Sequence, residues 1–253
     1  MNEYQSALYR YLLRLGDNAL IHGQRLSEWC SRGPTLEEDL ALTNIALDEI
    51  GRAQALFEYA AEVEAQGRKA DDLAFKRSER EYFNNLICEL PRGDFAITVM
   101  KQALLSAFEV PLFEALQESR DERLSAIAHK AHKEVRYHWQ HASDWCKRLA
   151  LGTNESKRRL QEALNALWMY TGELFEMYDD DAILANQQTT PDLNDIRATW
   201  MQTIGELIKT CDLKVPNVDY MQTGSRNGVH TEHLGHMLSE MQYLQRAYPD
   251  ARW

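Results

Sequence analysis

The chain has little cysteine, glycine or proline and no long apolar run. Its four cysteines are scattered over 253 residues, and no CxxC spacing exists for zinc or redox chemistry. Scattered cysteines in a long chain are typical of a reducing cytosol. No segment approaches the ~18 consecutive apolar residues of a membrane span, and the N-terminus lacks the apolar core of a signal peptide. We therefore expect a cytoplasmic protein with no membrane partner.

The chain also lacks an excess of positive charge. It holds 28 Lys and Arg against 39 Asp and Glu, a formal net charge of −11. Phosphate binding depends on Lys and Arg, so nucleic acid is not the expected partner, whereas local basic patches and protein partners stay open. The hydrophobic share of 44% is enough for a substantial core, and we expect one domain over residues 1–253.

Helical periodicity covers most of the sequence. Twelve glycines and six prolines fall mostly where that periodicity stops, and no segment alternates like a strand. Thr35 with Glu38 is typical of a capping box, and Pro111 is expected to kink or divide its helix. These patterns predict an all-α bundle of long helices. The predicted helices span 4–30, 36–66, 72–89, 95–119, 122–150, 154–178, 191–212 and 228–247.

Polar side chains interrupt the apolar stripes of four predicted helices. An unpaired carboxylate costs several kcal/mol to bury, so such groups must pair or bind a metal. The polar members are His22 in 4–30, Glu49 and Arg52 in 36–66, Gln102 and Glu109 in 95–119, and His138 in 122–150 with Glu134 at its edge. A di-iron carboxylate bundle accounts for a pattern of this kind. It uses a carboxylate from each of two helices and a Glu-x-x-His from each of the other two.

The sequence lacks any Glu-x-x-His or Asp-x-x-His. After Glu49, Arg52 stands where the imidazole is required, and a guanidinium has no lone pair to give to iron. Before His138, Val135 stands where the carboxylate is required, while Glu134 is four residues away. The ligand set of a di-iron centre is therefore broken.

A structural use of these residues is the favoured interpretation. Arg52 lies one turn from Glu49 and can supply the positive charge that a metal would supply, with Gln102 and His22 completing the hydrogen bonds. This interpretation predicts a metal-free polar core.

A modified metal site stays open as the alternative. It would use Glu49, Glu109, Glu134 and His138, and the chain would then be a self-sufficient di-iron oxidase with unusual ligands. A third hypothesis, from another class, is a generic helical interaction protein.

Seven short motifs, in order along the chain, carry a family resemblance. They are LRLGDN at 13–18, RLSEWC at 25–30, ALDEIGRAQ at 46–54, EREYFNNL at 79–86, GDFA at 93–96, KEVRYH at 133–138 and HTEHLG at 230–235. With them, the chain from about residue 8 to QYLQR at 242–246 resembles the family of structural, non-catalytic subunits of the bacterial ring 1,2-phenylacetyl-CoA epoxidase.

This resemblance implies a ferritin-like four-helix bundle with peripheral helices, acting in aerobic phenylacetate catabolism. In that complex a related, catalytic subunit holds the di-iron site, binds phenylacetyl-CoA and inserts one oxygen atom into the ring. The structural subunit lacks the full ligand set. The resemblance thus implies a heterodimer of the catalytic and structural subunits, paired again into a heterotetramer, that works with a separate reductase.

The resemblance also implies which positions are degenerate. Matched to the catalytic di-iron subunit, the chain retains Glu49 and His138. The other four ligand positions hold His22, Arg52, Gln102 and Val135. We therefore expect no catalytic, cofactor-binding or metal residue in this chain, and we expect iron only in the partner.

Four other groups of charged or metal-ligating residues have simpler interpretations than a binding site. His230 to His236 could bind metal, contact a partner, or cap and anchor the last helix, and the last is favoured. His129, His132 and His141 are expected at the surface or an edge. Asp179-Asp180-Asp181 is expected to be a solvated turn that ends a helix, and Lys157-Arg158-Arg159 an exposed first turn.

Overall fold

The computed structural model describes residues 1–249 and 251, and this part of the chain contains helices and no strand. The predicted all-α, ferritin-like fold class is confirmed. The chain divides into two compact units, described separately below. The first comprises Met1–Pro91 and the described part of Gly224–Trp253, and the second comprises Arg92–Thr223. The single domain expected over 1–253 stays a prediction.

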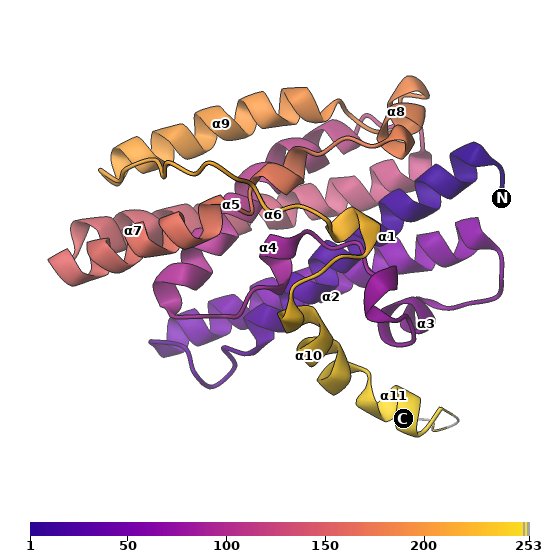
Figure 1. Cartoon of the computed structure of the whole chain (residues 1–253), viewed down its shortest axis with the longest axis horizontal. Coiled ribbons are helices and arrows are strands. Elements are labelled where there is room, and N and C mark those ends of the chain that lie inside the picture. Colours follow the sequence, from indigo (N-terminus) through magenta and orange to yellow (C-terminus); the bar gives the residue numbers. More distant parts are fainter. Residues whose placement is uncertain (250, 252–253) are drawn as a thin grey trace. The chain divides into compact units, whose positions relative to one another are not determined.

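The first unit is built on two long helices. Helix α1 (Glu3–Ser27) and helix α2 (Leu36–Glu64) lie side by side along their length and run antiparallel (Figure 1). Thr35 caps α2, because its hydroxyl accepts from the backbone N–H of Glu38, as the sequence predicted. The smaller elements of this unit are α3 (Ala70–Phe75), η1 (Glu79–Glu81), α4 (Leu86–Glu89), η3 (Ser225–Asn227), α10 (Glu232–Met241) and α11 (Tyr243–Ala247).

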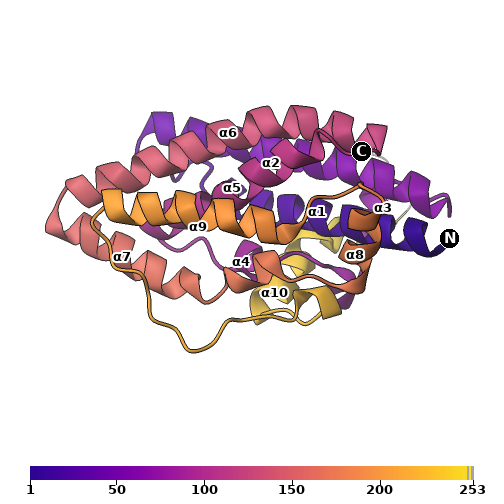
Figure 2. The same cartoon turned by 90° about the horizontal axis from the view of Figure 1, so that it is seen from above.

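The second unit is built on another pair of long helices. Helix α5 (Phe95–Leu116) packs on α6 (Glu122–Leu151), and α7 (Asn154–Trp168) and α9 (Leu193–Thr210) pack on α5 (Figure 2). The remaining elements are η2 (Gly172–Phe175) and α8 (Asp179–Asn186). Helix α5 is the one helix in the described residues that is long and apolar enough to cross a membrane, and it is mostly buried.

The predicted stripes of the four long helices are confirmed by burial. His22, Glu49, Arg52, Gln102 and His138 are all buried together with the apolar members of their stripes. Buried positions surround α5 almost completely, and Pro111 lies inside this helix without dividing it. We attribute the continuity to packing on all sides, which outweighs the hydrogen bond that proline cannot donate.

The predicted helix 72–89 is wrong. Helix α3 ends at Phe75, and the chain becomes extended after η1. The reason is a set of tertiary hydrogen bonds: Asp17 accepts from the N–H of Phe83, and Asn18 accepts from the N–H of Asn85. These bonds to α1 replace the helical bonds that the same N–H groups would otherwise make.

Two further predicted boundaries are corrected. The helix predicted over 154–178 ends at Trp168, where the Thr171 hydroxyl donates to the Trp168 carbonyl and a 3₁₀ turn follows. The aspartates 179–181 begin α8 and do not end a helix. The Asp181 carboxylate accepts from the N–H of Tyr178, and negative charge is favourable at a helix N-terminus.

The last predicted helix, 228–247, begins later and is interrupted. Gly228 has a positive φ of 69°, and Thr231 is the N-cap of α10. Helix α10 ends at Met241, and α11 starts anew at Tyr243. The first residues of the predicted helix therefore form the approach to α10, not its first turn.

Candidate functional site

In the first unit, Glu49 and Arg52 form a buried ion pair on α2. A spacing of three residues places both on the face that carries Ile45 and Leu56. Their side chains are 0% and 2% exposed, and the Arg52 guanidinium Nη2 donates to Glu49 Oε2. The predicted pair is confirmed. Since each charge is buried, removal of either one would take from the other its oppositely charged partner in this pair.

His22 lies on the part of α1 that passes next to this pair. His22 is buried, and its neighbour Gly23 lies so close to α2 that an added Cβ would be 3.0 Å from Glu49 Cβ. Glycine permits this close approach because it has no side chain. The structure therefore brings the turn that carries His22 beside Glu49, as the stripes predicted.

In the second unit, α5 and α6 contribute the other sequence-predicted residues. Gln102, Val135 and His138 are all buried. A carboxylate oxygen of Glu109 and a ring nitrogen of His138 lie within 4.8 Å of each other. Val135 lies one turn before His138 on the same buried face of α6. An isopropyl group thus occupies the position from which a carboxylate would have to bind metal.

Glu134 is at the edge of the buried face of α6, as predicted. Its carboxylate Oε1 lies 3.5 Å from Lys130 Nζ, and the lysine side chain is 72% exposed. Among the described residues, the metal-ligating side chains that gather near Glu109 and His138 do not include Glu134. Glu134, one of the four ligands of the alternative hypothesis, therefore lies outside that group.

The donors at the six degenerate positions do not fit a di-iron centre. Two of them, Arg52 and Val135, offer no lone pair to a metal. Gln102 can offer only a neutral amide oxygen where a carboxylate would offset metal charge. The buried guanidinium also adds a positive charge where two metal ions would already require negative ligands.

A second buried ion pair in the first unit was not predicted. Arg77 Nη1 donates to Asp17 Oδ2 at 3.0 Å and to the Glu81 carbonyl at 2.7 Å. Asp17 also accepts from the N–H of Phe83 at 2.9 Å, and both charged side chains are buried. These bonds connect α1 to the segment that follows α3.

His230 and Glu89 form a third buried polar pair. His230 Nδ1 lies 2.8 Å from Glu89 Oε2, and Nε2 lies 2.9 Å from the Tyr82 carbonyl. A carbonyl oxygen can only accept, so Nε2 must carry a proton, and the contact with Glu89 requires a further shared proton. Burial disfavours the charged imidazole, but the hydrogen bond and charge of Glu89 outweigh this and raise the pKa of His230 above its ordinary value.

The segment around His230 anchors the C-terminal helices. The N–H of Thr231 donates to Glu89 Oε1 at 2.6 Å, and the Thr231 hydroxyl accepts from the N–H of His233. The favoured interpretation of His230 to His236, capping and anchoring, is confirmed. Further along, Gln242 Nε2 donates to the Arg77 carbonyl and to the Tyr82 hydroxyl, at 3.0 and 2.9 Å.

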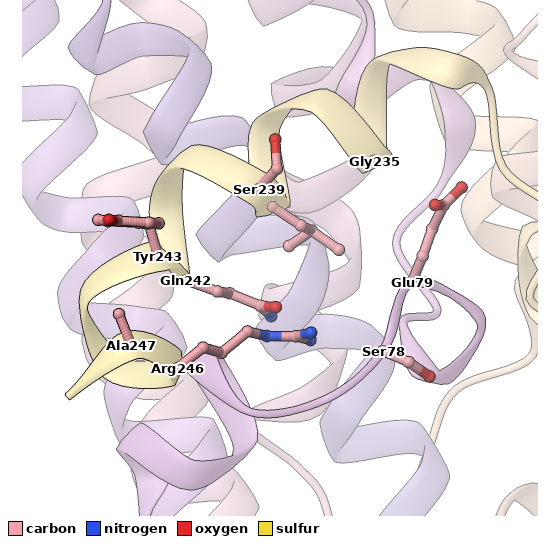
Figure 3. Close-up of a pocket in the computed structure, with 9 residues that line it drawn as sticks. Ser78, Glu79, Gly235, Ser239, Gln242, Tyr243, Arg246 and Ala247 are labelled. Carbon is pink, nitrogen blue, oxygen red and sulfur yellow. The ribbon is translucent and has the colours of Figure 1, made fainter. Parts of the chain in front are cut away.

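A shallow groove lies beside these anchors. Gln242, between α10 and α11, and Arg246 of α11 extend towards the segment that carries Ser78 and Glu79 (Figure 3). Arg246 Nη2 donates to the Arg77 carbonyl at 3.0 Å, so its charge is used in holding the segment. The groove has a volume of about 580 Å³ and is lined by Ser78, Glu79, Gly235, Leu238, Ser239, Gln242, Tyr243, Arg246 and Ala247.

The Asp17–Arg77 pair was missed although a signal for Asp17 exists. Leu13, Asp17 and Leu20 repeat at spacings of four and three residues, which makes a second apolar stripe on α1 with Asp17 as its polar member. The partner, 60 residues away, has no local signal. The same holds for Glu89 and His230, which are 141 residues apart.

The remaining charged clusters follow the simpler interpretations. His129 is exposed, and His132 and His141 are half-buried. Arg158 pairs with Glu155 and Glu162 on the surface of α7, so the basic run is an exposed first turn, as expected.

The fold and these side chains define an all-helical protein of the ferritin-like class, with buried ion pairs in its helical core. Comparison with known proteins then gives the family: residues 1–253 match the phenylacetic acid catabolic protein family, and the chain belongs to it. The chain is also similar to the C subunit of the 1,2-phenylacetyl-CoA epoxidase of Escherichia coli (strain K12). The two are 46% identical over 246 residues, which cover 97% of this chain and 99% of the relative.

Proposed function

We propose that this chain is the structural, non-catalytic subunit of a multicomponent phenylacetyl-CoA epoxidase. Its role would be to pair with and stabilise the di-iron catalytic subunit in aerobic phenylacetate catabolism. The name of the Escherichia coli relative supports the complex, since the two chains match over nearly their whole lengths. Membership of a phenylacetate family argues against the third hypothesis, a helical protein unrelated to this pathway.

One observation carries the non-catalytic part of the proposal. Arg52 is buried and ion-paired with Glu49 at the position where a di-iron protein requires a histidine. A guanidinium keeps its proton at all accessible pH values and cannot become a ligand by deprotonation. The pair therefore gives the buried Glu49 carboxylate a positively charged partner that is not a metal.

The proposal extends to cofactors, partners and location. We propose that this chain binds no cofactor and that the iron of the complex is held by the catalytic subunit. The assembly would be a heterodimer of the two subunits, paired into a heterotetramer and served by a separate reductase, in the cytoplasm. The net charge of −11 is compatible with protein partners and does not favour nucleic acid.

A second function is favoured by one contact. Glu109 and His138 lie within 4.8 Å of each other, which is the kind of carboxylate–imidazole pair that binds divalent metals. On this account the chain would be a self-sufficient oxidase with a modified ligand set. Val135 counts against it because this side chain has no carboxylate, and Glu134 counts against it because its carboxylate lies beside the exposed Lys130.

Reconstitution separates the two functions. The purified catalytic subunit, the reductase and this chain are combined, and phenylacetyl-CoA turnover is measured with each component left out in turn. The structural role predicts that this chain alone gives no turnover and that its omission abolishes turnover or the stability of the catalytic subunit. Turnover by this chain with reductase, when the catalytic subunit is left out, would instead establish the oxidase.

A further inference from the structure

The outer face of α2 carries a row of exposed leucines. Leu36, Leu40 and Leu47 are 73%, 55% and 60% exposed. Spacings of four and seven residues place them on one line of the helix, opposite the buried line that carries Glu49. Single exposed leucines are ordinary, but a row on one helix face is typical of a surface that binds another protein.

Gly51 continues this line one turn after Leu47. Apart from its chain neighbours and the nearby backbone of α2, no heavy atom lies within 4 Å of the position that its Cβ would occupy. Glycine inside a helix lowers helix stability relative to alanine, and no packing within the chain requires it here. What the missing side chain does provide is bare backbone that a second helix can approach closely.

The exposed charged side chains that α2 itself carries all have one sign. Within α2 the only basic residue is Arg52, which is buried on the opposite face. Glu37 and Glu58 are exposed, and no lysine occurs anywhere in the helix. A second copy of this chain would therefore bring acidic edge against acidic edge in an isologous contact. A partner helix with an apolar stripe between lysines or arginines has the complementary pattern.

We propose that the outer face of α2, formed by Leu36, Leu40, Leu47 and Gly51, docks an amphipathic helix of the catalytic subunit whose apolar stripe is flanked by basic side chains. This inference rests on the proposed function, since it names the surface by which the structural subunit would hold its partner. The leucines would pack against the apolar stripe of the partner helix, and Gly51 would allow the two backbones to approach closely. Glu37 and Glu58 would face the basic side chains of the partner.

The test uses the full chain and the purified catalytic subunit, with the dissociation constant measured by isothermal titration calorimetry. In the Leu40→Arg/Leu47→Arg variant, two apolar contacts are lost and like charges face the basic flanks, so we expect binding to weaken by about 100-fold or more. Gly51→Leu should weaken binding by about 10-fold, because it blocks close approach while it favours the helix itself. Thermal unfolding of each variant verifies that the chain folds.

A matched control changes exposed apolar residues outside α2. Leu151 and Met201 are 82% and 52% exposed, and Leu151→Arg/Met201→Arg should leave the dissociation constant unchanged. Equal binding by wild type and Leu40→Arg/Leu47→Arg would overturn the docking face and leave the proposed function intact. If the wild-type chain did not bind the catalytic subunit, that result would instead contradict the proposed function.

Analytical ultracentrifugation of the chain alone tests whether a second copy of this chain occupies the face instead, since it measures the oligomeric state. The charge pattern predicts that the wild-type chain does not self-associate through α2. If the wild-type chain were a dimer and Leu40→Arg/Leu47→Arg a monomer, the face would be a contact between copies, and the proposal would be overturned.

Discussion

Two buried polar clusters in the first unit differ in how they are built. Glu49 and Arg52 are three residues apart on one helix. Arg77 instead reaches Asp17 across 60 residues, and His230 reaches Glu89 across 141. The local pair joins two side chains of the same helix, α2, whereas the remote cluster connects α1, the segment after α3 and the C-terminal helices. Buried ion pairs therefore serve two purposes: the local pair compensates charge, and the remote cluster holds segments together that are distant in the sequence.

The difference predicts which cluster is harder to replace. A local pair that compensates charge can be exchanged for two apolar side chains of similar size at little cost. A cluster that also satisfies backbone groups cannot, because those groups lose their partners. The predictions below separate the two cases.

The largest loss is expected for Arg77→Ala. This change strands the buried Asp17 carboxylate and also removes donors to the Glu81 and Leu73 carbonyls. We expect the free energy of unfolding in urea to fall by about 5 kcal/mol, the upper end for a broken buried pair. The control is Arg158→Ala, whose surface pairs should contribute nothing measurable. A loss at Arg77 no greater than that of the control would contradict the remote cluster.

Arg52→Ala should lower the free energy of unfolding by about 3–5 kcal/mol, because the buried Glu49 carboxylate loses the positive charge of this ion pair. The double change Glu49→Leu/Arg52→Leu should recover most of this loss. Chemical denaturation of these two variants beside the wild type measures both effects. If Arg52→Ala were nearly neutral, the pair would not be buried. If the double variant were as unstable as Arg52→Ala, the pair would contribute more than charge compensation.

His230→Gln should lower the free energy of unfolding by about 1.5–3 kcal/mol, the range for buried hydrogen bonds to a charged group. The contribution of His230 to stability should depend on pH in one direction. The pKa of His230 is raised in the folded state, so its contribution is full below the ordinary value of about 6.5 and is lost as pH rises through the raised pKa. Wild type should therefore lose stability relative to His230→Gln as pH rises above about 6.5. Parallel curves for the two proteins over this range would contradict the shared proton.

Gly23→Ala tests how closely α1 covers the local pair. The added methyl would lie 3.0 Å from Glu49 Cβ and 3.3 Å from the Ala46 carbonyl oxygen. Overpacking of this kind costs about 1–3 kcal/mol, which thermal unfolding measures as a lower Tm. An unchanged Tm would mean that α1 yields easily at this point.

The smallest change in stability is expected for Gly51→Ala in α2, the helix of the local pair, and this change should be a gain. Nothing lies within 4 Å of the new methyl, so the intrinsic preference of alanine for the helix should raise stability by about 0.5–1 kcal/mol. A loss of stability here would show that the outer face of α2 is covered within the chain itself.

The sequence predicted the long helices and the local pair because both depend on nearby residues. The stripes through His22, Glu49, Gln102 and His138 repeat every three or four residues, and burial confirms them. The pairing of Arg52 with Glu49 follows from the same period. Pro111 was weighed by its local chemistry alone, and the packing around α5 outweighed that chemistry.

What the sequence did not predict depends on distant partners. The segment 72–89 has helical periodicity, yet Asp17 and Asn18 accept from the N–H groups of Phe83 and Asn85 and interrupt the helix at residues 82–85. Thr231 stops the last helix from starting at 228 because its N–H donates to Glu89, 142 residues away. Periodicity carries no information about such partners, so the remote cluster could be found only in the folded chain.

Iron analysis of the isolated chain tests the central claim most directly. The wild-type chain and its Arg52→His variant are incubated with excess Fe(II), passed through a desalting column, and analysed for iron by mass spectrometry. A guanidinium in place of a ligand predicts no retained iron in the wild type, and Arg52→His alone should not restore a two-iron site because Val135 and Gln102 still supply no carboxylate. Two tightly held irons per wild-type chain would contradict the account.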